Sequence, residues 1–291
     1  IEERRPVDRA TVFQVASVSK TVTAYAIMQL VEQQALSLDA DINEVLPFAV
    51  RNPRYPEAMI TLRHLLTHTS GIRDNWGVLE GTWVKDGDFP QSLRDSLSAY
   101  LLPGGEHFHA RKNFYGWAPG TEHDYSNVGI ALAALVAECH AGTSFEQLCE
   151  QQVFQPLEMT GPSYRLGGLE EGASVAMPYG LKRRSEHFER LGHHGYLDFP
   201  SGTLRISASD LARLLLCFMG DGEVDGARLL RPATVRDMRR ISFPKVAADQ
   251  GLVWYFDEMG GVRMMGHDGS DPGVASSMYY CPEDGVGFLV L

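Results

Sequence analysis

The first residues whose types and spacing could do chemistry are Ser17 and Lys20, three positions apart in the segment SVSK. Residues 17–34 carry apolar side chains at helical spacing, so both side chains should share one helix face and the amine should reach the hydroxyl. A serine oxygen needs a base, and a lysine can serve once burial and nearby positive charge lower its pKa. The free N–H groups at the helix start would stabilise negative charge during acyl transfer. The pair indicates a serine nucleophile, although taken alone it is a weak motif.

Two further polar groups could complete such a site. Tyr125 and Asn127 open a predicted buried helix, so a phenol and an amide stand at a second helix start. Residues 267–270 (HDGS) are expected between two predicted strands. There Gly269 would let a substrate lie close against the strand backbone.

The elements that must position these residues are a strand and a helix, a long helical middle, and then strands. A strand is expected over residues 11–15, and helices are expected over 17–34, 60–68 and 127–140. Further helices should begin at the capping patterns of Ser144 and Ser207 and at Pro232. From Gly251 onwards, β-rich runs separated by turn residues predict an antiparallel meander: LVWYF, VRMM, VASSMYY and VGFLVL. The order predicts an α+β fold, an antiparallel sheet flanked by helices with a mostly helical lobe inserted.

Residues 72–116 do not fit this pattern, because their aromatic side chains are scattered among Gly, Asp and Pro without a clear period. A long aromatic and irregular segment is often a binding loop or lid. The alternative is that the rings only pin a loop to the surface.

Composition excludes several classes of function. The chain has 291 residues, of which 44% are hydrophobic and 22% are charged, as in ordinary globular proteins. Its net charge of −11 and its lack of basic runs argue against nucleic acid as a partner. Its apolar stretches are far shorter than the roughly 20 residues that span a bilayer, so no membrane span is expected. Four cysteines lack metal-ligand spacing and are expected to be buried free thiols: Cys139, Cys149, Cys217 and Cys281.

Beyond the three motifs, five segments in order resemble the serine β-lactamases and low-molecular-weight penicillin-binding proteins: FQVASVSKTVTA, LLTHTSGI, APGTEHDYSNVGIALAALV, SGTLRISASDLARLL and GHDGSDPGVASSMYY. The resemblance is closest to the branch of class C β-lactamases, D-Ala-D-Ala carboxypeptidases and family VIII esterases. It implies a single β-lactamase/transpeptidase-like domain, with an α/β lobe at about residues 1–35 and 200–291 and a helical lobe at about 36–199. Such relatives have two strands before the nucleophile helix and a helix after the last strand. The chain, which begins with Ile1, is therefore expected to start and stop inside the domain and to leave VGFLVL short of cover.

The same resemblance implies a role for each site residue. Ser17 would be the nucleophile, Lys20 its activating partner, and Tyr125 the general base or proton shuttle. Asn127 would help to hold Lys20 and a substrate amide, and the backbone N–H groups of Ser17 and Ser270 would form the oxyanion hole. No cofactor or metal is implied.

Position 267 departs from the lysine that β-lactamases carry there. His267 should hold a substrate carboxylate more weakly than a lysine, because histidine is only partly charged near neutral pH. The sequence therefore favours an esterase or a D-amino-acid peptidase with weak β-lactamase activity at most, acting on small esters, amides or peptides.

The sequence bears on several alternative functions. A β-lactamase proper and a non-catalytic sensor or scaffold with the same fold stay open, although Ser17, Lys20, Tyr125 and Asn127 are all intact. The chain has no G-x-S-x-G segment, which argues against an α/β-hydrolase. Its histidines lack an H-E-x-x-H pattern, so exposed loop histidines explain them better than a metal site does. Natural substrate, compartment and oligomeric state are left open.

Overall fold

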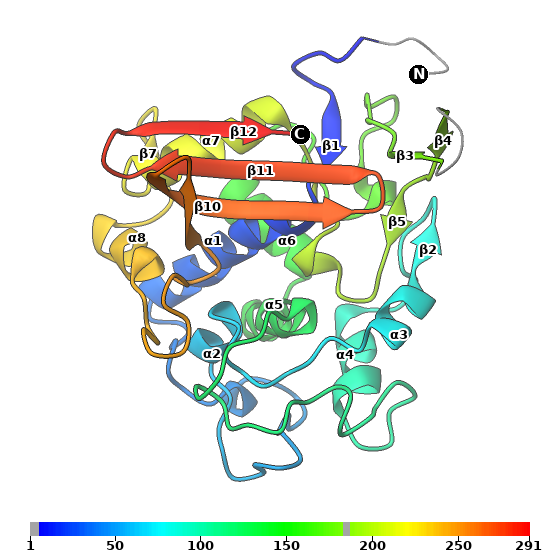
Figure 1. Ribbon diagram of the computed structural model, residues 1–291, viewed down its shortest axis with the longest axis vertical. Helices are drawn as coiled ribbons and strands as arrows, with labels where there is room; N and C mark the ends of the chain where they lie inside the picture. Colours follow the sequence, from blue (N-terminus) through cyan, green and yellow to red (C-terminus); the bar gives the residue numbers. More distant parts are fainter. Residues whose placement is uncertain (1–5, 183–186) are drawn as a thin grey trace.

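The computed structural model describes residues 6–182 and 187–291, and its centre is an antiparallel sheet with the strand order β12-β11-β10-β9. These strands are β9 (Tyr255–Met259), β10 (Val262–Asp271), β11 (Val274–Cys281) and β12 (Val286–Val290). The sheet crosses the upper half of the molecule, with helices behind and below it (Figure 1). The predicted meander and the α+β class are thus confirmed.

Helix α1 (Ser19–Glu32) runs behind the sheet and is buried along most of its length. Its first turn is preceded by a 3₁₀ turn, η1 (Ala16–Val18), which contacts both β10 and β11. Strand β1 (Val12–Gln14) leads into this turn and pairs with β6 (Arg205–Ser207). The strand and helix predicted from residues 11–34 are confirmed, with the helix ending at Glu32 rather than at residue 34.

Helix α5 (Asn127–Ala141) is the core of the helical part and packs on α1, α2 (Leu62–Leu66), α4 (Leu93–Leu101) and α6 (Phe145–Cys149). Ser126 caps its start by accepting from Gly129 N at 2.9 Å, and Gly142 ends it in the left-handed region at φ 68°. Capping side chains also start α6 at Ser144 and α7 (Ala208–Met219) at Ser207. Helix α8 (Pro232–Arg239) begins with its proline, as predicted.

Shorter elements connect these parts. They are η2 (Ile42–Glu44), α3 (Trp76–Leu79), η3 (Glu80–Thr82), β2 (Val84–Lys85), the π-helical turn η4 (Glu150–Phe154), η5 (Leu166–Gly168), β3 (Tyr179–Leu181), β4 (Phe188–Arg190), β5 (His194–Gly195), η6 (Phe199–Ser201), β7 (Glu223–Val224) and β8 (Ala227–Arg228). Pairs of short strands join β2 to β5, β3 to β4 and β7 to β8.

Three details differ from the sequence predictions. The segment 72–116 is not wholly irregular, because α3, η3, β2 and α4 form within it. Strand β9 starts at Tyr255 rather than at residue 252, because Val253 adopts a left-handed φ of 68° that interrupts the run. Residues 267–270 lie inside β10 rather than between strands. Their polar side chains suit a turn equally well, which is why the sequence placed them outside the strand.

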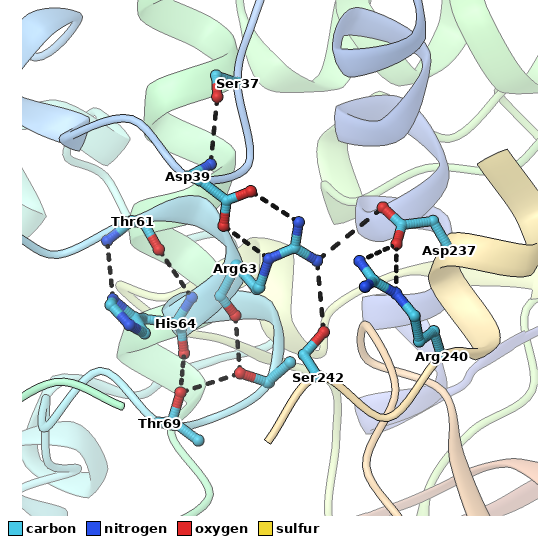
Figure 2. Close-up of polar contacts among 10 residues, drawn as sticks. Ser37, Asp39, Thr61, Arg63, His64, Thr69, Asp237, Arg240 and Ser242 are labelled. Atoms are coloured by element: carbon cyan, nitrogen blue, oxygen red, sulfur yellow. Dashed lines mark hydrogen bonds and ion pairs between the residues drawn. The ribbon is translucent and has the colours of Figure 1, made fainter. Parts of the chain in front are cut away.

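An ion-pair network around Arg63 fixes α2 to its neighbours (Figure 2). Arg63 Nε and Nη2 donate to the Asp39 carboxylate at 2.7 and 2.8 Å, and Nη1 lies 3.3 Å from Ser242 Oγ and 3.9 Å from Asp237. The network joins the loop after α1 to α2 and α8. The turn that follows α2 carries His68, whose ring packs against that of Tyr125 in the site described below.

Some predicted features concern the surface and the thiols. Val286, Phe288 and Val290 of β12 are exposed. All four cysteines are free thiols; three are buried, and Cys139 is half-buried. Among the described residues no single helix has the length and apolarity to cross a membrane, and α5 with the α6–η4 segment passes that test only as a pair bent by 81°.

Candidate active site

Ser17 lies in the η1 turn that enters α1, pressed against the sheet. Ser276 Oγ of β11 donates to Val15 O at 2.7 Å, which ties this turn to the sheet. A Cβ added to Gly269 would lie 2.4 Å from Val15 O and 2.9 Å from Ser17 N. The glycine is therefore required by the close approach of the serine segment. Gly269 also lines the pocket, so the expectation that it makes room for a substrate stays a prediction.

Lys20 is fully buried one turn along from Ser17. Its Nζ lies 2.8 Å from Ser17 Oγ, 2.7 Å from Asn127 Oδ1 and 2.7 Å from Ser201 O. Burial lowers the pKa of Lys20 to about 7, against the opposing effect of the carboxylates of Asp198, Asp74 and Asp271.

The three contacts determine what the neutral amine can do. A carbonyl and an amide oxygen only accept hydrogen bonds, so Ser201 O and Asn127 Oδ1 each take one N–H of Lys20. The neutral amine has two N–H groups, and its lone pair is then left for the third contact, Ser17 Oγ. The geometry is that of a base held against a serine hydroxyl.

Asp74 holds Asn127 in this orientation. Its carboxylate accepts from the backbone N of Asn127 at 2.9 Å, from Asn127 Nδ2 at 2.8 Å, from Val128 N at 3.1 Å and from Ser126 Oγ at 3.1 Å. Because Asn127 Nδ2 donates to the Asp74 carboxylate, Asn127 Oδ1 is turned toward Lys20. Burial raises the pKa of Asp74, and these hydrogen bonds act in the opposite direction.

Tyr125 lies across the site from Lys20, with the Lys20 Nζ 4.8 Å from its ring centroid. Although 38% of Tyr125 is exposed, its hydroxyl is hydrogen-bonded to Ser17 inside the site. Burial raises the pKa of Tyr125, so the phenol keeps its proton near neutral pH. The His68 ring packs against the Tyr125 ring with centroids 4.4 Å apart and planes tilted by 33°, and it accepts from Ser126 N at 3.2 Å, which fixes the position of Tyr125.

His267 lies on β10 beside Tyr125, with 6.2 Å between ring centroids. Its Nδ1 lies 2.6 Å from Asp268 O, and since a carbonyl can only accept, Nδ1 carries the proton. Burial, reinforced by the charge of Lys20, lowers the pKa of His267 to about 3. The ring is neutral at physiological pH, which goes further than the weak cation that the sequence predicts.

A pocket of about 520 Å³ opens onto Ser17. Its walls come from α3, the segment around Trp83, the η6 region and β10. Trp76, Leu79 and Trp83 line it, which supports the binding-loop interpretation of residues 72–116. Ser270 lines it too, next to Gly269; the oxyanion hole made of Ser17 and Ser270 stays a prediction.

The structure thus gathers Ser17, Lys20, Tyr125 and Asn127, and places His267, Gly269 and Ser270 along the adjacent strand. Sequence reasoning missed Asp74, Asp198 and His68. Asp198 is buried behind Lys20, and its pKa is raised to about 7 by burial and by Asp74. No local pattern marks these three residues, because each acts through a neighbour that is distant in sequence. Among the described residues no cluster of His, Cys, Asp and Glu could hold a metal ion.

The comparisons with known proteins agree with this geometry. The family model described as Beta-lactamase matches residues 1–291. Penicillin-binding protein 4 of Amycolatopsis lactamdurans is 28% identical, over 95% of this chain and 70% of its own length. Esterase EstB of Burkholderia gladioli is 32% identical, over 54% of this chain and 40% of its own length. A penicillin-binding protein from Bacillus halodurans superposes with a TM-score of 0.75 at 27% identity, over 99% of this chain and 82% of that one.

Proposed function

The chain belongs to the Beta-lactamase family, and from this membership and the geometry at Ser17 we propose that it is a serine hydrolase that cleaves esters or amides through an acyl-enzyme. The observation that carries the proposal is the 2.8 Å contact between Lys20 Nζ and Ser17 Oγ, made by an amine whose pKa is about 7. Near neutral pH about half of such amines are unprotonated and able to take the serine proton. The match to EstB covers 40% of that protein, so the activity of EstB as a whole comes to this chain only as part of the proposal.

The acylation step follows from the contacts around Lys20. Neutral Lys20 takes the Ser17 proton while Ser17 Oγ bonds to the substrate carbonyl carbon, and the carbonyl oxygen becomes an oxyanion. The backbone N–H groups of Ser17 and Ser270 stabilise that charge. The bond to the leaving group then breaks as this group takes up a proton, which leaves Ser17 acylated. Water attacks the ester in the second step, with the same groups moving protons in reverse.

Tyr125 acts in this scheme as a proton relay rather than as a phenolate base. Its raised pKa disfavours the phenolate, whereas a neutral hydroxyl can accept one proton and donate another. Its hydrogen bond to Ser17 and the 4.8 Å from its ring centroid to Lys20 Nζ support a role in passing the proton from the base to the leaving group. A non-catalytic role would not require this arrangement.

Weak β-lactamase activity at most is expected, because the neutral ring of His267 gives no positive charge to bind the carboxylate of a β-lactam. Asp198, Asp268 and Asp271 line the same pocket and would repel that carboxylate. Short-chain p-nitrophenyl esters should therefore be hydrolysed faster than a chromogenic cephalosporin.

The test is labelling by an active-site serine probe together with p-nitrophenyl acetate hydrolysis, in the wild type and in Ser17→Ala. Both signals should be lost in the variant. The control is Ser144→Ala, which removes a helix-capping hydroxyl remote from Lys20 and should keep both signals. Equal labelling of wild type and Ser17→Ala would end the proposal, and faster cephalosporin turnover would end the preference for esters.

A further inference from the structure

The side of the active-site pocket that faces the substrate is rich in hydrogen-bond acceptors and poor in positive charge. Three carboxylate residues line the pocket, Asp198, Asp268 and Asp271, and no Lys or Arg is among its described lining residues. The nearest ammonium, that of Lys20, already has three oxygen neighbours. A substrate with a carboxylate would therefore enter against like charge.

An unpartnered acceptor confirms this bias on one side of Ser17. His267 is only 2% exposed, lines the pocket, and has no hydrogen-bond partner for Nε2. Because Nδ1 donates to Asp268 O, the Nε2 of the neutral ring carries a lone pair and no proton. A buried acceptor of this kind needs a ligand that brings an N–H or O–H group.

Asp271 provides a charged acceptor on the other side of Ser17. His267, Gly269 and Asp271 lie at every second position along one face of β10, and four steps of about 3.4 Å put about 14 Å between the histidine and the aspartate. Gly269, between them, is the residue packed against Ser17 N. A substrate lying along β10 thus meets His267 at one end and Asp271 at the other.

The carboxylate of Asp271 is held in place but not neutralised. Its Oδ2 accepts from Gln14 Nε2 at 3.0 Å and from Tyr196 OH at 2.9 Å, both neutral donors. Among the described residues it forms no ion pair with Lys or Arg within 4.0 Å. The guanidinium of Arg205 attracts it only through space, and donates instead to the carbonyls of Thr203 and His194.

Aromatic rings stand beside this carboxylate. Trp83 and Tyr196 both line the pocket, and their centroids lie 6.0 Å apart. Ring faces attract cations, and a carboxylate next to them supplies the charge-assisted hydrogen bond that an ammonium group needs. The same surroundings offer nothing to a carboxylate.

This inference rests on the proposed serine hydrolase. We propose that the preferred substrates are esters or amides whose acyl group carries a free primary ammonium, which Asp271 binds beside the rings of Tyr196 and Trp83. Asp268 does not share this role. Its carboxylate already accepts from Ser277 Oγ at 2.6 Å, Tyr279 OH at 2.8 Å and Tyr255 OH at 3.2 Å. His267 accepts an N–H or O–H group at the opposite end of the same substrate.

The test compares the p-nitroanilides of D- and L-alanine with their N-acetyl derivatives, which lack the charge. For the faster enantiomer, kcat/KM of the free amine should exceed that of the acetylated form by about 10- to 100-fold, the size of a hydrogen bond to a charged group. The difference should lie mainly in KM. Asp271→Asn should remove most of this preference. Asp257→Asn is the matched control, because it removes the same charge from an exposed site on β9 and should leave the preference intact.

A second measurement on the wild type keeps the inference testable if Asp271→Asn does not fold. Butylammonium should inhibit p-nitrophenyl acetate hydrolysis competitively, and butyrate should not. Equal or faster turnover of the acetylated anilides, or a preference that survives Asp271→Asn, overturns the inference. If the serine probe labels Ser17 but neither free-amine anilide is cleaved, the inference fails while the proposed hydrolase stands. Absence of labelling at Ser17 removes both.

Discussion

The pKa of Lys20 makes a quantitative prediction for the pH dependence of ester hydrolysis. The active form of the amine is the unprotonated one, so kcat/KM should rise with pH and level off above a midpoint near 7. Below that midpoint each pH unit should reduce the rate about tenfold, so that about 1% of the plateau remains at pH 5. His267 does not titrate in this range, because burial lowers its pKa to about 3, and burial also lowers the pKa of His68 well below its ordinary value.

The size of the effect follows from the change in the pKa of Lys20. At its ordinary pKa of 10.5, only about one lysine in 3,000 would be neutral at pH 7, whereas at about 7 half are neutral. Burial thus supplies roughly a thousandfold more of the active base, equivalent to about 4 kcal/mol. Lys20→Arg should lower kcat/KM at pH 7 by at least about a thousandfold and abolish the midpoint near 7, because a guanidinium keeps its proton.

Asp198 also has a pKa of about 7, so an Asp198 variant is needed to assign the midpoint to one of the two groups. Its charge is the largest influence that raises the pKa of Lys20, so Asp198→Asn should move the acid limb to lower pH while an acid limb persists. The assay is kcat/KM for p-nitrophenyl acetate from pH 4.5 to 9, a range of about two units on either side of the midpoint, corrected for spontaneous hydrolysis. A wild-type midpoint above 9, or disappearance of the limb in Asp198→Asn, would refute the assignment of the base to Lys20.

Two further predictions concern positioning. Asp74→Ala should lower the free energy of unfolding by about 2–4 kcal/mol, because four hydrogen bonds to a charged cap are lost, and should reduce kcat/KM as Asn127 is released. Urea unfolding checks this against Asp95→Ala, an exposed acid at the start of α4 that should change stability by less than about 1 kcal/mol; equal effects would contradict it. Gly269→Ala should reduce serine-probe labelling by about 100-fold, because its Cβ would lie 2.4 Å from Val15 O; Gly81→Ala, with open space around it, should label normally. Wild-type labelling of Gly269→Ala would show that the serine turn does not depend on this close approach.

The fold was predictable from the sequence wherever a local pattern determines the local structure. Helix α5 has an apolar run, a serine cap and a terminal glycine, and it begins and ends where these residues indicate. Helix α4 has the same kind of cap at Ser92, but the surrounding aromatic residues hide its period. Strand β9 starts late because the left-handed backbone at Val253 is set by tertiary packing, which the apolar run LVWYF does not reveal.

The site was predictable only where chemistry and local spacing coincide. Ser17 and Lys20 are one helical turn apart, so their contact follows from the sequence, whereas the 2.7 Å contact between Lys20 and Asn127 spans 107 positions and was reached only through the family resemblance. Asp74 and Asp198 could not be recognised, because an isolated aspartate in a loop has no period and no motif. Their effect depends on burial beside Lys20, which only the folded chain creates.

The neutral ring at position 267 and the lowered pKa of Lys20 belong to one electrostatic arrangement. The charge of Lys20 disfavours protonation of His267, and by reciprocity a permanent cation at position 267 would lower the pKa of Lys20 further. The carboxylates of Asp198, Asp74 and Asp271 act in the opposite direction and keep Lys20 near 7 rather than below it. Two of these carboxylates, Asp198 and Asp271, also line the pocket, and they give it negative charge. The residues that set the pKa of Lys20 therefore also determine which substrate charge the pocket prefers, and they favour an ammonium group over a carboxylate.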